Sequence, residues 1–252
     1  MDAAEAKDRA AFDEALKGLW KTMTLVQTSM DTMWQFADPK SYDRFRTFIM
    51  GVKQQPMFPN GLIYEGVSEE PKFLRGETGA NDSIVPTVDN VLEMTSCMPS
   101  NPLTRILQDF RKYRPPDQQQ WLTYTEERAR EAGVRSFALG NANSAVLYQA
   151  NLDQLREFRD RHWRFTKEYI IRFTDHPVAT GGSPIITWLP NQLKAVMDQM
   201  VAVKEHVDPS QLRPELSVLH DQLTRKAQQQ ERLLVKEVQE LKKKFPGQDL
   251  ED

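Results

Sequence analysis

The N-terminal part of the chain carries apolar side chains at alternating spacings of four and three. Side chains at these spacings lie on one face of an α-helix. The series predicts one long helix from about Ala4 to Phe36, ended by Asp38-Pro39. We interpret the apolar face as core packing. Its members are Phe12, Leu16, Leu19, Met23, Val26, Met30 and Met33.

A second apolar stripe contains a histidine and lies in a helix predicted from about Asn143 to Phe173. Its members, again spaced by three and four, are Leu155, Phe158, His162, Phe165 and Tyr169. An imidazole that faces the interior needs a partner, because burying a polar group without one costs roughly a few kcal/mol. The partner of His162 is either a hydrogen-bonding group in the core or a metal, and the pattern alone leaves both open.

Helical periodicity continues through most of the chain, and proline, glycine and capping residues mark the predicted helix ends. Between Lys53 and Ile84 the periodicity is lost, and so long an irregular segment is usually functional. Strand-like alternation is confined to the region around Leu62-Ile-Tyr64, so we predict an all-α fold. The other predicted helices are one capped by Ser41 with Phe45, Phe48, Ile49 and Val52 on its inner face, one opened by Pro86, one opened by Asn101-Pro102, a polar one ending near Gly133, one from Pro190 to Val207 and a charged one from about Glu215 to Phe245.

The composition excludes several classes of protein. Charged residues make up 27% of the 252 residues and the net charge is −3, which argues against nucleic acid as a partner. A single cysteine, Cys97, allows no intrachain disulfide and favours a reducing compartment. No apolar run approaches the roughly 20 residues that span a membrane, and the acidic N-terminus is not a signal peptide. We therefore expect a cytoplasmic protein without membrane contacts.

Three segments, taken in order, resemble the indoleamine 2,3-dioxygenase family of haem enzymes. They are Gly61-Leu-Ile-Tyr-Glu-Gly66 followed by Leu74-Arg-Gly-Glu-Thr-Gly-Ala80, then Leu155 to Ile171, then Ala179-Thr-Gly-Gly182. The resemblance covers roughly Ala10 to Met200. It implies the large helical domain of that family, with haem b held between long helices. We accordingly expect residues 1–210 to form a haem-binding domain and residues 211–252 to form a charged C-terminal helix that packs on it or binds a partner.

The resemblance implies a role in haem binding for five residues. His162 matches the proximal ligand of the haem iron and is the metal ligand we expect. Thr78 and Gly79 match the small-residue loop near the haem edge on the opposite face. From its position in the helix, Phe158 is close enough to line the haem slot, although core packing explains it equally well. Arg159 is one of the flanking arginines that could pair with a haem propionate, and a solvated helix face is the alternative.

A further five residues are expected to contact substrate. Arg46 matches an arginine that binds the substrate carboxylate, although a structural ion pair is the alternative. The family's aromatic position beside the indole is Ser41 here, and Tyr42 follows it. Thr180 and Gly181 match a mobile loop that closes over the substrate, where two consecutive glycines let the backbone hinge.

The activity implied by the resemblance is oxidation of tryptophan or another indole-containing substrate by dioxygen on ferrous haem. The family's smaller N-terminal domain, which roofs the pocket, has no counterpart among these residues. Three interpretations follow: a second protein chain supplies the roof, the enzyme is divergent and acts on a bulkier substrate, or the chain is a haem-binding or regulatory protein without dioxygenase activity.

Overall fold

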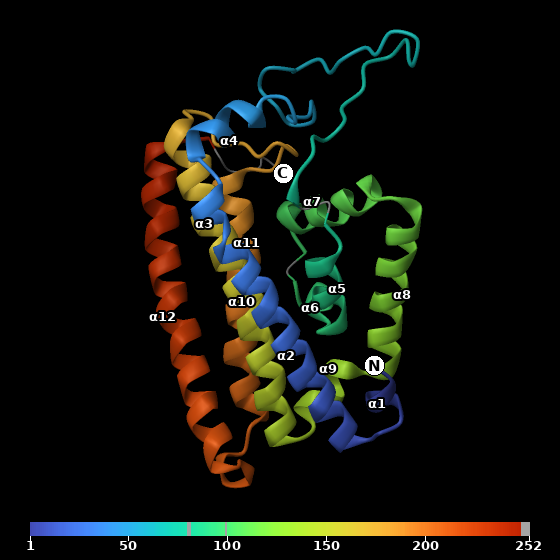
Figure 1. The fold of residues 1–252 in the computed structure, drawn as a ribbon, viewed down its shortest axis with the longest axis vertical. Helices are drawn as coiled ribbons and strands as arrows, with labels where there is room; N and C mark the ends of the chain where they lie inside the picture. The colour runs from blue at the N-terminus through green and yellow to red at the C-terminus, as the bar shows by residue number, and fades with distance from the viewer. Residues whose placement is uncertain (80–81, 99, 248–252) are drawn as a thin grey trace.

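In a computed structural model the chain folds into a helical bundle, described over residues 1–79, 82–98 and 100–247 (Figure 1). Within these residues the only β-pairings are two isolated antiparallel bridges, Leu62 with Lys72 and Val178 with Pro184. The predicted all-α fold is therefore confirmed. None of the helices described is both long and apolar enough to cross a membrane.

The helices differ widely in length, from 4 residues in α1 to 31 residues in α12. The α-helices are α1 (Asp2–Glu5), α2 (Arg9–Asp31), α3 (Met33–Phe36), α4 (Pro39–Arg46), α5 (Ile84–Val91), α6 (Met94–Cys97), α7 (Pro102–Phe110), α8 (Pro116–Ala132), α9 (Val134–Leu139), α10 (Ala142–Tyr169), α11 (Ile185–Ala202) and α12 (Pro214–Lys244). Short 3₁₀ turns are η2 (Arg111–Tyr113), η3 (Ile171–Phe173), η4 (Val203–His206) and η5 (Pro209–Gln211).

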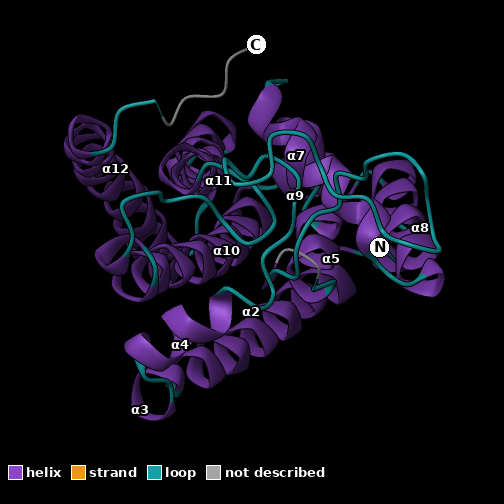
Figure 2. Ribbon diagram, turned by 90° about the horizontal axis from the view of Figure 1, so that it is seen from above, coloured by secondary structure: helices purple, strands orange, loops and turns teal. Residues whose placement is uncertain are grey.

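Helix α10 is the central element of the bundle. It packs against α2 on one side and α11 on another, and α12 lies against both α11 and α10 (Figures 1 and 2). The N-terminal half of α10 is buried almost all round, which explains why polar residues such as Gln149 and Asn151 occur there with hydrogen-bonded partners. The buried N-terminal half therefore anchors the C-terminal half of α10, which carries His162.

The predicted helix from Ala4 to Phe36 is in fact interrupted near its start. Lys7 adopts a left-handed backbone conformation (φ 57°), and the Asp8 carboxylate then caps α2 by accepting a hydrogen bond from the Ala11 amide at 3.0 Å. A side-chain cap competes with helix continuation, and apolar spacing alone does not detect it. A second interruption falls at Thr32, between α2 and α3.

Two other helix starts also differ from prediction. Helix α4 is capped by Asp38, whose carboxylate accepts a hydrogen bond from the Ser41 amide at 2.7 Å, so Ser41 is not the cap. The inner face predicted for this helix is wrong, because α4 ends at Arg46 and Phe48, Ile49 and Val52 lie beyond it. Phe45 and Phe48 are exposed, whereas Val52 is buried. Helix α11 begins at Ile185 rather than at Pro190, which lies inside it.

The charged C-terminal helix α12 lies along α10 through both apolar and ionic contacts. Leu234 and Phe245 are buried against the core. Lys226 forms ion pairs with Asp153 at 3.1 Å and Glu157 at 2.6 Å on α10. Residues 248–252 of the predicted C-terminal unit lie outside the described residues.

Candidate functional site at His162

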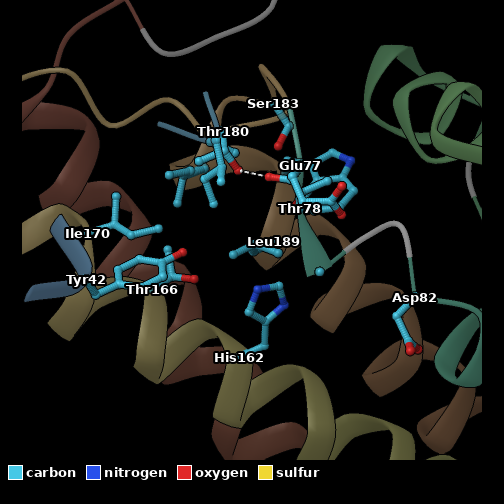
Figure 3. A pocket seen from close by; sticks show the side chains of 15 residues that line it. Tyr42, Glu77, Thr78, Asp82, His162, Thr166, Ile170, Thr180, Ser183 and Leu189 are labelled. Carbon is cyan, nitrogen blue, oxygen red and sulfur yellow. Dashed lines mark hydrogen bonds between the residues drawn. The ribbon is translucent and has the colours of Figure 1, made fainter. Parts of the chain in front are cut away.

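Two adjoining cavities, each about 450 Å³, meet at His162 on α10. One faces the loops that carry Thr78 and Thr180, and the other extends between α10, α2 and α5 toward Met30 and Phe158. Figure 3 shows the imidazole on one side of the first cavity and the loop residues on the opposite side. The structure thus brings His162 together with both loops that the sequence analysis assigned to the site.

The imidazole of His162 is directed into this space without a protein partner. Among the residues that the structure describes, none forms a hydrogen bond with either ring nitrogen. Burial, together with the positive charge of Arg159, lowers the pKa of His162 to about 4. The ring is therefore neutral at pH 7 and has a lone pair available for a metal.

The second cavity is walled mainly by apolar side chains. Phe158 lines it, as predicted from its position one turn before His162. Trp163, in contrast, is buried on the other side of α10, where its indole nitrogen donates a hydrogen bond to Glu237 of α12 at 2.7 Å. The remaining apolar lining residues include Val26, Met30, Met33, Val85, Pro86, Leu107 and Phe165.

Arg159 also lines the second cavity, but its guanidinium already has partners. It donates to both carboxylate oxygens of Asp89 at 2.8 Å, and to the backbone carbonyl of Gln192 at 3.0 Å. Asp89 is buried, and burial raises its pKa even though Arg159 opposes this effect. The role predicted for Arg159 with a haem propionate would therefore compete with a buried ion pair.

Two buried polar side chains around the cavities have no partner in the described part of the chain. Gln192, on α11, is 4% exposed, and neither its amide nitrogen nor its amide oxygen is hydrogen-bonded. The hydroxyl of Ser183, which is 1% exposed, is likewise unpaired. The sequence analysis missed both residues, because no motif or spacing distinguishes them from ordinary core or loop residues.

The loop opposite His162 places both of its predicted residues at the cavity. Thr78 and Gly79 line the first cavity, and Gly79 also lines the second. A Cβ added at Gly79 would meet no atom within 4 Å, so a small residue here leaves open space. Ala80, which ends the matched segment, lies outside the described residues.

The loop around Thr180 is held by its own backbone carbonyls, each of which accepts a hydrogen bond from the segment at residues 46–75. Thr180 itself lines the first cavity, and its hydroxyl donates to the Glu77 carbonyl at 2.6 Å (Figure 3). The Arg46 guanidinium donates to the Val178 carbonyl, and the Gln55 side-chain amide donates to the Ala179 carbonyl at 2.8 Å. The Gly51 backbone amide donates to the Thr180 carbonyl at 2.9 Å, and the Arg75 guanidinium donates to the Gly181 carbonyl at 2.7 Å.

The two glycines of this loop are required by close packing. A Cβ at Gly181 would lie 2.6 Å from the Phe110 ring, and one at Gly182 would lie 2.0 Å from the Lys53 carbonyl oxygen. Gly182 also has φ 85°, a conformation that other residues rarely adopt. The structure therefore gives these glycines a packing role besides the hinge that the sequence analysis assigned to them. Gly181 does not line either cavity.

Three of the predicted substrate contacts, Ser41, Tyr42 and Arg46, lie on α4, and of these only Tyr42 lines the cavities. Its ring meets that of Tyr169 edge-on, with centroids 5.9 Å apart. Ser41 is exposed and lies outside the lining. Arg46 is buried behind the cavity wall, where it bonds the Val178 carbonyl and forms no ion pair with a described residue, although its Nε has no partner.

Arg75 is a further residue that the sequence analysis did not single out. Its side chain is buried, donates to Asp109 at 2.8 Å and lies over the Phe110 ring at 4.8 Å from the centroid. Burial of Asp109 raises its pKa, but hydrogen bonds from Lys53 and Arg75 outweigh this, so the pKa lies below its usual value. Arg75 thereby ties α7 to the Thr180 loop.

Comparison with known proteins places this site in a family. A sequence model described as indoleamine 2,3-dioxygenase matches residues 1–184. Indoleamine 2,3-dioxygenase 2 of Mus musculus is 28% identical over 80% of this chain and 53% of its own length. Indoleamine 2,3-dioxygenase 1 of Rattus norvegicus is 27% identical over 68% of this chain and 42% of its own length. Myoglobin of Haliotis madaka is 26% identical over 81% of this chain and 55% of its own length.

The chain spans about half the length of the curated relatives it matches. The family match nevertheless covers the helix with His162 and both loops that face it, and it extends over more than half of the chain. The chain belongs to the indoleamine 2,3-dioxygenase family.

Proposed function

We propose that this chain binds haem b, with His162 as the axial ligand of the iron. Haem supplies four of the iron's ligands itself and needs an axial ligand and an apolar slot from the protein. The observation that carries the proposal is a half-buried, neutral imidazole that faces a cavity and has no partner among the described residues.

The residues around the cavities fit such a group. Each cavity, at about 450 Å³, is within the range of roughly 300–1,000 Å³ that is usual for ligand pockets. The apolar walls contributed by α2, α5 and α10 suit the face of a macrocycle. Thr78 and Gly79 leave open space opposite His162.

We further propose that the chain takes part in oxidation of tryptophan or a related indole by dioxygen. When bound, haem supplies the iron at which dioxygen is activated. The protein's own residues orient the indole and exclude water. Tyr42 and Thr180 line the first cavity and are the substrate contacts we propose there. Arg46 would reach a substrate carboxylate only after leaving the Val178 carbonyl, and its unpaired Nε supports that exchange.

A second protein chain is part of this proposal. The segment between α4 and α5 extends beyond the ends of the helices (Figure 1). Large apolar side chains of this segment are exposed. Exposed apolar surface is typical of interaction sites, and we propose that the partner binds this segment. We also propose a cytoplasmic location, supported by the single cysteine. The exposed apolar side chains of the segment, each at least 46% exposed, are Phe48, Met57, Ile63, Val67, Phe73 and Leu74.

Binding of haem without dioxygenase activity is the second candidate function. The match to a myoglobin of Haliotis madaka favours it, because that relative covers 81% of this chain. Under this alternative His162 keeps its role, whereas Tyr42 and Thr180 have no substrate to contact.

The first experiment is an absorption spectrum of the chain purified with haem supplied, before and after dithionite and carbon monoxide. We expect a Soret band that shifts as a histidine-ligated ferrous haem does. The variant His162→Ala should lose the band, whereas His206→Ala, which removes an exposed histidine on η4, should keep it. A Soret band of unchanged intensity in His162→Ala would refute the assignment.

Turnover separates the two candidate functions. Consumption of dioxygen with L-tryptophan should be measured with the chain alone and with the chain co-expressed with the part of the Mus musculus relative that lies outside the match. Turnover that appears or rises with this second polypeptide supports a two-chain enzyme. A stable Soret band without turnover in either sample favours haem binding alone.

A further inference from the structure

We infer that Gln192 is the positioning residue of His162, with its amide oxygen accepting the hydrogen bond of the second ring nitrogen. This inference rests on the proposed haem site. Gln192 lies on α11, which packs against α10, and its amide oxygen would fix the orientation of the His162 ring when the other ring nitrogen holds iron.

The first support is that Gln192 lies buried with its whole amide unused. An amide can make four hydrogen bonds, and a buried amide that makes none is rare and costly. Within the described residues Gln192 is 4% exposed, and neither amide atom has a partner. Such a group needs an explanation, and a bond that forms only in the ligand-bound protein is one.

The second support is the unmet requirement of His162. A histidine that binds metal through one nitrogen carries a proton on the other, and it nearly always donates that proton to an acceptor. No acceptor bonds the ring among the described residues, although the ring is only partly exposed. In the same cavity, α10 therefore presents the His162 ring, which has no acceptor, and α11 presents the Gln192 amide, which has no donor.

The backbone brings these two groups to neighbouring positions. Arg159, one turn before His162 on α10, donates to the backbone carbonyl of Gln192 at 3.0 Å. Leu189, one turn before Gln192 on α11, lines both cavities with His162 and stands beside the imidazole in Figure 3. Residue 192 therefore lies one turn along α11 from Leu189, and its side chain lines the second cavity together with His162.

Several other polar groups around His162 already have partners. The Asp89 carboxylate holds Arg159 through both oxygens. The Trp188 indole nitrogen can only donate, and it bonds the Leu103 carbonyl at 3.0 Å. Three competing acceptors line a cavity with His162. They are the Asp82 carboxylate, of which Oδ1 accepts the Ile84 amide at 2.7 Å, the Ser183 hydroxyl and the Thr166 hydroxyl, one turn beyond His162.

The test measures the iron–histidine bond rather than turnover. Donation from the ring makes the bound nitrogen more basic, so loss of the acceptor should weaken the bond. In the ferrous haem-loaded chain, Gln192→Met should lower the iron–histidine stretching frequency in resonance Raman spectra and raise the reduction potential. Gln192→Glu, a stronger acceptor, should move both in the opposite directions. The control Thr166→Val should leave both unchanged.

A second measurement removes folding as an explanation. In the haem-free chain Gln192→Met loses no protein hydrogen bond, so its melting temperature should be no lower than that of the unmodified chain. A fall in the haem-free chain would show that Gln192 has a structural partner and would overturn the inference.

The possible failures are distinguishable. An unmodified chain without a Soret band overturns the proposed function and this inference together. A normal Soret band with an unchanged stretching frequency in Gln192→Met overturns only the role of Gln192. A shift in Thr166→Val but not in Gln192→Met assigns the acceptor to Thr166 instead.

Discussion

The loop side and the helix side of the first cavity differ in whether their polar groups have hydrogen-bonded partners. On the loop side, the carbonyls of residues 178–181 are each bonded by the segment at residues 46–75. On the helix side, the imidazole of His162 and the side-chain amide of Gln192, which lines the adjoining second cavity, have no hydrogen bond to a described residue. Bonded carbonyls fix a backbone, whereas unmet polar groups cost stability unless something binds them. The contrast separates the scaffold of this site from the groups left for a ligand.

The largest loss of stability is expected from Gly182→Ala, which places a side chain in the closely packed Thr180 loop. The new Cβ would lie 2.0 Å from the Lys53 carbonyl, and the backbone has φ 85°. Strain and overpacking of this kind together cost roughly 3 kcal/mol or more. We expect a correspondingly lower free energy of unfolding in urea titrations.

The matched control for this change is Gly66→Ala. Gly66 has a similar φ of 75°, but a Cβ there would meet no atom within 4 Å. Only the conformational cost, roughly 1 kcal/mol, should remain. Equal losses in the two variants would show that the Thr180 loop is not packed as described.

The next largest effect is expected from Arg75→Ala. It removes the bonds to Gly181 and Asp109 and leaves Asp109 with Lys53 at 2.6 Å. Truncating one partner of a buried ion pair costs roughly 3 kcal/mol, and a remaining lysine partner should reduce this to about 2 kcal/mol. Hydrogen exchange of the amides at residues 179–183 should accelerate more than exchange in α12.

Arg105→Ala is the control for this variant, because Arg105 is an exposed arginine on α7. It should change neither the free energy of unfolding nor amide exchange in the loop. If Arg75→Ala also left amide exchange at residues 179–183 unchanged, the loop would be ordered by its glycines and not by the carbonyl bonds.

The sequence predicts features that depend on local contacts better than features that depend on tertiary packing. Helix α10, its inward-facing His162 and the cap at Asn101 depend on local spacing and local hydrogen bonds, which a sequence displays directly. The partners of Arg75 are 34 and 106 residues away along the chain, so only tertiary packing brings them together.

The side chains around the ligand site also depended on tertiary contacts. Arg159 was predicted to be near haem because of its place beside His162, but its ion pair with Asp89 spans 70 residues and could not be foreseen. Residues matched to the family by motif, such as Thr78 and Thr180, line the first cavity. Arg46 and Ser41 were assigned by counting back from Gly61, and neither lines the cavity.

The smallest effect, and the sharpest test of the contrast, is expected from two hydroxyls in one loop. Thr180 donates to the Glu77 carbonyl at 2.6 Å, whereas the buried hydroxyl of Ser183 has no partner in the described part of the chain. Thr180→Val should cost about 1 kcal/mol, because it removes a hydrogen bond. Ser183→Ala should cost nothing or stabilise by about 0.5 kcal/mol, because it removes only an unpaired polar group. Thermal unfolding of the haem-free chain measures both, and a larger loss in Ser183→Ala would mean that Ser183, and not Thr180, belongs to the scaffold.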